Sequence, residues 1–326
     1  MATFLVTGGA GFIGSAIVEE LVARDHEVRV LDNLATGNRD NLDAVRGSIR
    51  MLEGDIRDPV TVRLACSDVD FVLHQAALCS VARSVADPVT TAEVNIHGTL
   101  NVLIAARDAG VRRVVFAGSS SVYGDNPVLP KREDAEPRPM SPYAIAKLAG
   151  EHYCRVFHRL YGLETVVLRY FNVFGPRQRP DSHYAAVIPR FVDAALHGHR
   201  PVIYGDGEQS RDFTYVSNVV CANLLACEAP DAPGRVFNIA CGSRVSLLQL
   251  LDLLREQTGN GTEPERADPR PGDVRHSLAD ISRAATILGY TPQIDIREGL
   301  RHTVEWHRTR LSLIERAQST ALGASA

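Results

Sequence analysis

The first half of the chain alternates short apolar runs with longer stretches in which apolar residues recur at helical spacing. The apolar runs occur at 3–7, 27–31, 50–53, 71–74 and 113–117, and a further run ends at Leu168 and Arg169. Between the first two runs, Ile17, Val18, Leu21 and Val22 mark one face of a helix. Strands that alternate with helices run parallel, with helices on both faces of the sheet. The pattern therefore predicts an α/β fold with a Rossmann-like, doubly wound parallel sheet over residues 1–169.

The alternation stops after Arg169, and the second half mixes helical and short strand-like patterns without a regular order. Such patterns occur at 185–197, 202–203, 216–227, 236–239 and 247–257. We expect a smaller mixed α/β domain over 170–315 that binds the substrate, with the chain returning to the first domain near 213–240. Residues 258–275 are rich in Gly, Pro and charge and predict a long loop. From residue 316 the apolar periodicity is lost, which predicts a frayed tail over 316–326.

A glycine-rich string follows the first predicted strand and precedes the first predicted helix. Gly8 permits a tight turn, Gly11 lets the backbone approach a pyrophosphate, and Gly14 lets the helix pack closely on the strand. Asp32 ends the second strand, where a carboxylate can accept both ribose hydroxyls of adenosine and would repel a 2′-phosphate. The pattern therefore predicts binding of NAD rather than NADP. The predicted cofactor contacts are Gly8, Gly11, Phe12, Ile13, Gly14, Asp32, Asn33, Asp55, Ile56, Ala76, Ala77 and Asn95, together with Tyr143 and Lys147.

Two of these contacts have a second interpretation. Asp55 follows the third strand and can meet the adenine, but it can also cap the helix that begins near Asp58, and the two roles are compatible. Asn95 lies within a long helix predicted over 88–108. It either makes a polar contact inside the helix or supports the loop on the cofactor side.

Composition narrows the function by exclusion. The chain has 326 residues, 45% of them hydrophobic, and a formal net charge of −4, which argues against general binding to nucleic acid or to anionic membranes. No apolar run approaches the ~20 residues that span a bilayer, and the start lacks the basic region of a signal peptide. Six scattered cysteines without a C-x-x-C pair predict reduced thiols in a cytoplasmic protein. The histidine spacings predict no metal site.

A hydroxyl cluster and a Tyr–Lys pair form the candidate catalytic site. Ser119, Ser120 and Ser121 follow the fifth strand, at the sheet edge where ligands bind in such folds. Ser141 and Pro142 predict a helix start, which puts Tyr143 and Lys147 one turn apart on one face. The ammonium and a cationic nicotinamide would lower the pKa of the phenol. Tyr143 could then take a proton from a substrate hydroxyl as hydride leaves the adjacent carbon.

These motifs together resemble the extended short-chain dehydrogenase/reductases, and more narrowly the NAD-dependent nucleotide-sugar epimerases and dehydratases, especially bacterial UDP-N-acetylglucosamine 4-epimerases. The resemblance covers about residues 1–310 and makes Ser119 the catalytic hydroxyl, since it lies four residues before the Tyr of Val122-Tyr123-Gly124. Dehydratases of this family carry Asp-Glu after that hydroxyl, and decarboxylases carry a Glu. Here Ser120 and Ser121 occupy these positions, so the resemblance favours epimerisation at C4 of a UDP-hexose. Ser120 and Ser121 also remain candidates for substrate contact.

The resemblance further implies residues that bind the UDP-sugar. Asn172, Arg211 and Arg275 match the diphosphate contacts, and the stretch 184–189 with Val187 and Ile188, together with Tyr204, would line the uridine side. Ser277 matches a position where a small residue admits a 2-acetamido group, which implies UDP-N-acetylglucosamine and its galacto epimer as substrates, with UDP-glucose and UDP-galactose as a further pair.

The sequence leaves several functions open. A UDP-glucuronate 4-epimerase would need a cationic contact to the carboxylate, for which Arg83 is a candidate. A nucleotide-sugar dehydratase, decarboxylase or reductase is compatible with the same motifs, and so is a non-catalytic NAD-binding protein. The resemblance also implies a homodimer, formed by the helices at about 88–108 and 143–160.

Overall fold

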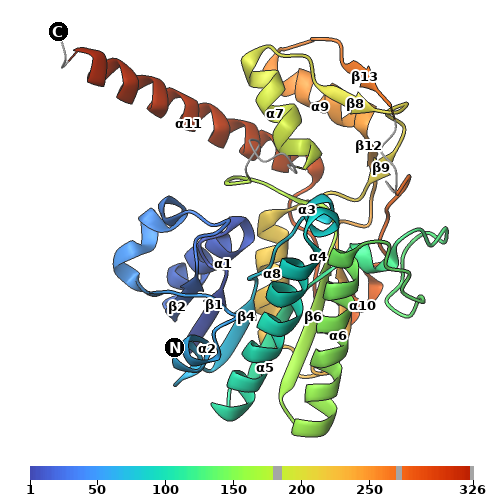
Figure 1. Cartoon of the computed structure of the whole chain (residues 1–326). Helices are drawn as coiled ribbons and strands as arrows, with labels where there is room; N and C mark the ends of the chain where they lie inside the picture. Colours follow the sequence, from blue (N-terminus) through green and yellow to red (C-terminus); the bar gives the residue numbers. More distant parts are fainter. Residues whose placement is uncertain (179–185, 269–273, 324–326) are drawn as a thin grey trace.

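A seven-stranded parallel sheet forms the centre of the molecule (Figure 1). The computed structural model describes residues 1–178, 186–268 and 274–323, with side chains up to residue 313. The strand order is β11-β6-β5-β4-β1-β2-β3, and every neighbouring pair is parallel. The predicted fold class is therefore confirmed. The strands are β1 (Thr3–Thr7), β2 (Glu27–Asp32), β3 (Ile49–Glu53), β4 (Phe71–His74), β5 (Arg113–Ser119), β6 (Glu164–Tyr170) and β11 (Val236–Ile239).

Helices cover both faces of the sheet, and each face has its own apolar core. On one face α1 (Phe12–Ala23) and α8 (Val216–Glu228) bury Ile17, Leu21 and Val219 against the strands. On the other face lie α2 (Pro59–Cys66), α5 (Thr99–Asp108) and α6 (Pro142–Tyr161). Shorter helices complete this part: η1 (Arg39–Ser48), α3 (Val81–Ala86), α4 (Pro88–Ala92), η2 (Glu93–Gly98) and η3 (Ser120–Tyr123).

The helix predicted over 88–108 is a continuous run of α4, η2 and α5 whose middle part is π-helical. The π turn contains Asn95, and both ends of the Asn95 amide bond the backbone of Leu78. π segments inside α-helices frequently occur next to functional sites.

The second unit lies at the carboxyl edge of the sheet and has its own core (Figure 1). Helices α7 (Val187–His197), α9 (Leu247–Thr258) and the start of α11 (Ile296–Gly323) pack together through residues such as Phe191, Leu250 and Leu300. After α8 and β11, the chain adds α10 (Ser282–Leu288) beside the sheet. Three strand pairs complete the unit: β7 (Val173–Phe174) with β10 (Thr214–Tyr215), β8 (Val202–Tyr204) with β13 (Glu265–Ala267), and β9 (Ser210–Arg211) with β12 (Val245–Ser246).

Two predictions about secondary structure were wrong. The predicted loop at 258–275 contains β13, because its backbone pairs with β8; residues 269–273 lie outside the described part of the chain. The predicted frayed tail is helical through Gly323 as part of α11. Residues such as Glu315, Arg316 and Ala317 have high helix propensity, so a helix can continue there without an apolar stripe.

Candidate active site

A cleft of about 1980 Å³ separates the carboxyl edge of the sheet from the second unit. Parts of the chain as distant in sequence as α1 and α11 line this cleft. Most of the predicted site residues meet there. They are Gly8, Gly11, Phe12, Ile13, Gly14, Asp32, Asn33, Asp55, Ile56, Ala76, Ala77, Ser119, Ser120, Ser121, Tyr143, Lys147, Asn172, Tyr204, Arg211 and Ser277.

The glycine-rich turn has the geometry of a phosphate-binding loop. Gly8 has a φ of +70°, and a Cβ there would lie 2.7 Å from the Ala76 nitrogen. A Cβ on Gly14 would lie 2.1 Å from the Gly8 carbonyl oxygen, so α1 can approach β1 only with glycine there. Gly11 caps α1 without a side-chain hydrogen bond. The N–H groups in the first turn of α1 therefore point into the cleft, where an anion can accept them.

Asp32 and Asp55 form the other end of this part of the cleft. The buried carboxylate of Asp32 accepts hydrogen bonds from the nitrogens of Ala10 (2.9 Å) and Leu34 (2.8 Å). Burial raises the pKa of Asp32, and these two bonds oppose the rise. A second lone pair remains on each oxygen for a ribose hydroxyl. Asn33 donates to Asp55 (2.8 Å), and hydrogen bonding from Arg57 lowers the pKa of Asp55 to about 2.

This donor set fits NAD. The helix start with free N–H groups suits a pyrophosphate, the glycine contacts leave room that a Cβ would fill, and the carboxylate of Asp32 suits an unphosphorylated ribose. The residue that caps α2 is Asp58, which accepts the nitrogens of Val60 and Thr61. The capping interpretation of Asp55 was therefore wrong.

The catalytic candidates lie where β5 ends and α6 begins. Ser121 donates its hydroxyl to the Ser119 oxygen (2.8 Å), and Ser119 in turn is hydrogen-bonded to the phenol of Tyr143. The Ser141 hydroxyl accepts the nitrogen of Ala144 (3.2 Å), and Pro142 occupies the first turn, so α6 begins where the sequence predicts. A hydroxyl pair next to a phenol can bind a substrate hydroxyl and transfer its proton.

The predicted lowering of the Tyr143 pKa is not seen in this structure. Burial raises the pKa of Tyr143, the nearby Cys79 thiol adds to the rise, and the hydrogen bond with Ser119 opposes it. Burial is the main physical reason. Lys147 donates to the Ala117 carbonyl at 2.8 Å, and its Nζ lies 6.0 Å from the centre of the Tyr143 ring. Burial also lowers the pKa of Lys147, against the charges of Cys79 and Glu151. Burial thus favours the neutral phenol of Tyr143.

The second unit contributes polar groups to the wall facing Tyr143. Asn172 has a φ of +35° and donates to the Asp212 carbonyl (3.0 Å). Arg211 donates to the Arg275 carbonyl (3.1 Å) and is one of the residues that line the cleft. Tyr204 stacks beneath the Arg190 guanidinium at 5.7 Å. Ser277 lies on the same wall and donates its backbone nitrogen to Ser210 (3.0 Å).

Four predicted contacts are not part of the cleft wall formed by the described residues. Asn95 lies behind it and bonds Leu78, so that of its two interpretations the structure supports the loop-supporting role. Val187 and Ile188 pack into the core of the second unit, because they lie on the apolar face of α7. The Arg275 side chain is 63% exposed and pairs with Asp206 at 2.7 Å. Residues 184 and 185 lie outside the described part of the chain.

Sequence reasoning missed several residues that line the cleft, among them Cys79, Lys131, Tyr170 and Arg177. The signal for Cys79 was its place five residues after the end of β4, at the ligand-binding edge of the sheet. Arg177 has a φ of +69° and joins the second unit to α1 through Ser15 (3.1 Å) and Glu19. No local sequence pattern predicts such a long-range contact. Among the described residues, no cluster of three or more potential metal ligands occurs and no helix could cross a membrane.

Fold and cleft together define a class: an NAD-binding α/β protein whose Ser–Tyr–Lys site lies where a hydride acceptor would bind. Comparison with known proteins supports this class. A curated relative, the UDP-glucose 4-epimerase of Mycolicibacterium smegmatis, is 41% identical over 310 residues, covering 94% of this chain and 98% of that protein. The solved UDP-glucose 4-epimerase of Thermotoga maritima, with UDP-glucose, matches with a TM-score of 0.91 and 42% identity over 95% of this chain and 99% of the other.

The UDP-N-acetylglucosamine 4-epimerase of Methanobrevibacter ruminantium M1, solved with UDP-N-acetylmuramic acid, matches with the same TM-score, identity and coverage. The model of the NAD dependent epimerase/dehydratase family matches residues 4–240. The chain therefore belongs to the NAD dependent epimerase/dehydratase family, and its cofactor is NAD.

Proposed function

We propose that the protein is a UDP-hexose 4-epimerase that interconverts UDP-N-acetylglucosamine and UDP-N-acetylgalactosamine, and that also accepts UDP-glucose and UDP-galactose. The observation that carries the proposal is the hydroxyl site of Ser119, Ser121 and Tyr143 beside an NAD-type cleft. Similarity to UDP-sugar 4-epimerases over nearly the whole chain supports it.

In the proposed mechanism, Tyr143 removes the proton from O4 of the sugar while Ser119 orients that hydroxyl. Bound NAD supplies a hydride acceptor and donor for C4, and its positive ring charge favours the phenolate. Lys147 holds a second positive charge near the phenol. The transient 4-keto sugar rotates within the cleft, and Tyr143 then returns a proton to O4.

Turning the sugar requires that the UDP part stays bound while the hexose rotates. We assign this role to Arg211 and Asn172, which line the second-unit side of the cleft. Arginine engages diphosphate oxygens in pairs. Arg275 is a weaker candidate because its side chain pairs with Asp206.

The residues after Ser119 argue against the other reactions of the family. Dehydration and decarboxylation call on a carboxylate next to the catalytic hydroxyl. Ser120 and Ser121 occupy those positions, and Ser121 bonds Ser119. A reversible oxidation at C4 needs only one group that accepts and returns a proton.

The test is an assay without added NAD. The purified protein is incubated with UDP-glucose, UDP-N-acetylglucosamine and UDP-glucuronate in parallel, and the products are identified by NMR. We expect C4 epimers of the first two sugars. Turnover of UDP-glucuronate alone would make the protein a glucuronate epimerase, with Arg83 as a contact to examine. No turnover of any sugar would favour a non-catalytic NAD-binding protein.

The position of Ser277 gives a test of substrate size. A Ser277→Tyr variant should lose UDP-N-acetylglucosamine turnover by at least about tenfold, equivalent to 1.4 kcal/mol, and keep UDP-glucose turnover. If the variant still accepts the acetamido sugar as well as the wild type, Ser277 does not control the size of the pocket.

We also propose a cytoplasmic homodimer. Its support is an apolar surface on α3, α4 and α6, which contact one another. Exposed residues on this surface are Val85, Val89, Ile145, Val156 and Leu160. All six cysteines are free, as expected in a reducing compartment.

A further inference from the structure

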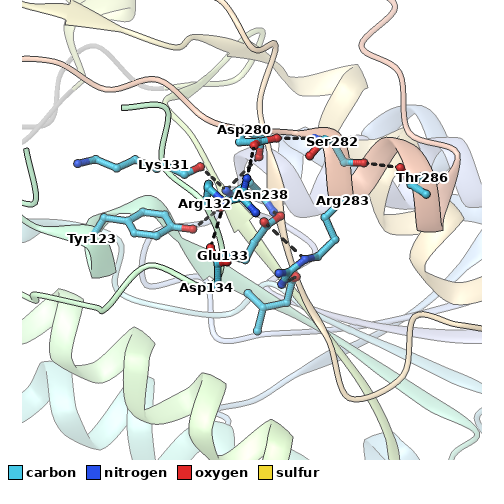
Figure 2. Close-up of polar contacts among 11 residues, drawn as sticks. Tyr123, Lys131, Arg132, Glu133, Asp134, Asn238, Asp280, Ser282, Arg283 and Thr286 are labelled. Carbon is cyan, nitrogen blue, oxygen red and sulfur yellow. Dashed lines mark hydrogen bonds and ion pairs between the residues drawn. The ribbon is translucent and has the colours of Figure 1, made fainter. Parts of the chain in front are cut away.

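Asn238, on the edge strand β11, has a fully buried side chain whose amide nitrogen and oxygen are both hydrogen-bonded. Its Nδ2 donates to the carbonyl oxygens of Lys131 (2.9 Å) and Asp280 (3.1 Å), and its Oδ1 accepts the hydroxyl of Tyr123 (2.6 Å). Figure 2 shows the Tyr123 hydroxyl and the backbone carbonyls of Lys131 and Asp280 around Asn238, whereas the Lys131 side chain points away from it. We call Asn238, Tyr123, Lys131 and Asp280 the Asn238 cluster.

The cluster joins three segments that are distant in sequence. Tyr123 ends η3, the turn that contains Ser120 and Ser121. Lys131 belongs to the loop at 124–140, and Asp280 precedes α10. The last two segments also pair through their backbones, since Lys131 donates to Leu278 (2.7 Å) and accepts from Asp280 (2.8 Å).

Ser277 lies three residues before Asp280 and is therefore held from two sides. On one side its nitrogen donates to Ser210 (3.0 Å), and the nitrogen of Ala279 donates to the carboxylate of Asp212 (3.2 Å). On the other side stands the Asn238 cluster. Ser277 lines the cleft, and so do Tyr123 and Lys131 of the cluster, whereas Asn238 and Asp280 are not among the lining residues. The cluster therefore forms part of the cleft wall and supports it from behind.

Charged groups surround the cluster. Glu133, whose side chain is buried, accepts the backbone nitrogen of Asn238 at 2.9 Å and lies 3.7 Å from Arg283. Arg132 lies 3.6 Å from the Asp280 carboxylate. Figure 2 shows Arg283 on the side of Asn238 away from Tyr123. Because buried amides that lose a partner cost stability, the three segments are expected to move together or not at all.

We propose that Asn238 is a positioning residue that sets the distance between Ser277 and the serine turn, and so selects between 2-acetamido and 2-hydroxyl UDP-hexoses. This inference rests on the proposed function. Asn238 touches no substrate; it acts through Ser277 and Tyr123. Loosening the cluster lets the segment at 277–280 shift within the pocket, and the contact surface for the acetamido group is lost first because that group is the larger one.

The test compares kcat and KM for UDP-N-acetylglucosamine and UDP-glucose in Asn238→Ala and Tyr123→Phe variants. Tyr123→Phe removes a single hydroxyl, so it provides the test if Asn238→Ala does not fold. We expect the ratio of kcat/KM for the two sugars to fall on the order of fivefold in each variant, mainly through KM for the acetamido sugar. Combined with Ser277→Tyr, the Asn238→Ala effect on this ratio should largely disappear, since both act at one position.

Asn218→Ala is the matched control. Asn218 is also a buried amide, and it bonds the backbone of Gln293 and Ile294 away from the cleft. It should lower the Tm without changing the sugar ratio. The proposal would be overturned if the ratio of kcat/KM for the two sugars stayed within twofold of the wild type in both cluster variants. It would also be overturned if the effects of Asn238→Ala and Ser277→Tyr on this ratio simply multiplied in the double variant.

The proposed function can fail separately. If the wild type epimerises neither sugar, that function is wrong. The affinities of the two UDP-sugars, measured by calorimetry in the wild type and the variants, then test the positioning role alone. An affinity ratio that the cluster variants leave unchanged would overturn it.

Discussion

At the residue scale, the site depends on a phenol that burial keeps neutral. Burial raises the pKa of Tyr143, and in the proposed mechanism the positive charge of bound NAD favours the phenolate that removes the O4 proton. Tyr143→Phe should lower turnover by about 10²–10⁴-fold, as expected for loss of a general base, while the protein keeps its NAD. Turnover is measured by NMR and NAD by release and absorbance. Tyr153→Phe, on the same helix, is the control, and undiminished turnover in Tyr143→Phe would refute the assigned role.

The sequence identifies residues well where a local motif fixes them. Gly8, Ser119, Tyr143 and Lys147 could be predicted because strand ends and helix starts place such residues at the cleft. Sequence patterns do not identify site residues whose side-chain position depends on long-range contacts. Arg275, for example, pairs with Asp206. The prediction for Val187 and Ile188 failed for a different reason. An apolar helix face can pack against the core or against a ligand, and here it packs into the core.

At the element scale, α1 approaches β1 only because Gly14 lacks a side chain. A Gly14→Ala Cβ would lie 2.1 Å from the Gly8 oxygen and 2.8 Å from the Gly9 Cα. The turn must shift, and we expect NAD affinity to fall by at least about tenfold, or 1.4 kcal/mol. Gly47→Ala is the control, since a Cβ there meets nothing within 4 Å. Equal NAD content in the purified wild type and Gly14→Ala protein would contradict the account.

The elements themselves were mostly predictable because apolar periodicity determines them. The five apolar runs predicted as strands became β1 to β5 with bounds shifted by at most two residues. The strand β13 was missed, since a strand of three residues within a polar stretch depends on its partner β8. The π-helical turn η2 was also missed, because the sequence around Asn95 has ordinary helical periodicity.

At the scale of the whole molecule, stability should depend on pH through His74. This residue is buried between Thr7 (2.6 Å) and Thr99 (3.0 Å), and burial lowers its pKa to about 3. The unfolded chain takes up a proton below about pH 6.5, and the folded protein does not. The stability that neutral His74 contributes is therefore complete above pH 6.5 and is lost as the pH falls toward 3.

Between pH 6 and 5, the unfolding free energy of the wild type should fall because of His74 by up to about 1.4 kcal/mol per pH unit. The His74→Gln variant should lack this fall. Urea unfolding at both pH values measures this difference. His152→Gln, at an exposed position on α6, is the control. An equal pH dependence in the wild type and His74→Gln would exclude His74 as its source.

The proposed dimer is also a property of the whole molecule. Leu160→Glu places a charge on the apolar surface of α6, where Leu160 is 67% exposed. We expect the wild type to have twice the chain mass of 35.5 kDa and the variant to dissociate, as measured by light scattering. Leu64→Glu on α2, a similarly exposed position, should leave the mass unchanged. A monomeric wild type would rule the dimer out.

The most direct test of the central claim follows the hydrogen at C4. UDP-N-acetylglucosamine labelled with deuterium at C4 is incubated in ordinary water with the purified protein and no added NAD. The account predicts the galacto epimer with deuterium retained at C4, because the hydride leaves and returns within a closed cleft. Loss of the label to solvent, or a product altered at another carbon, would contradict it.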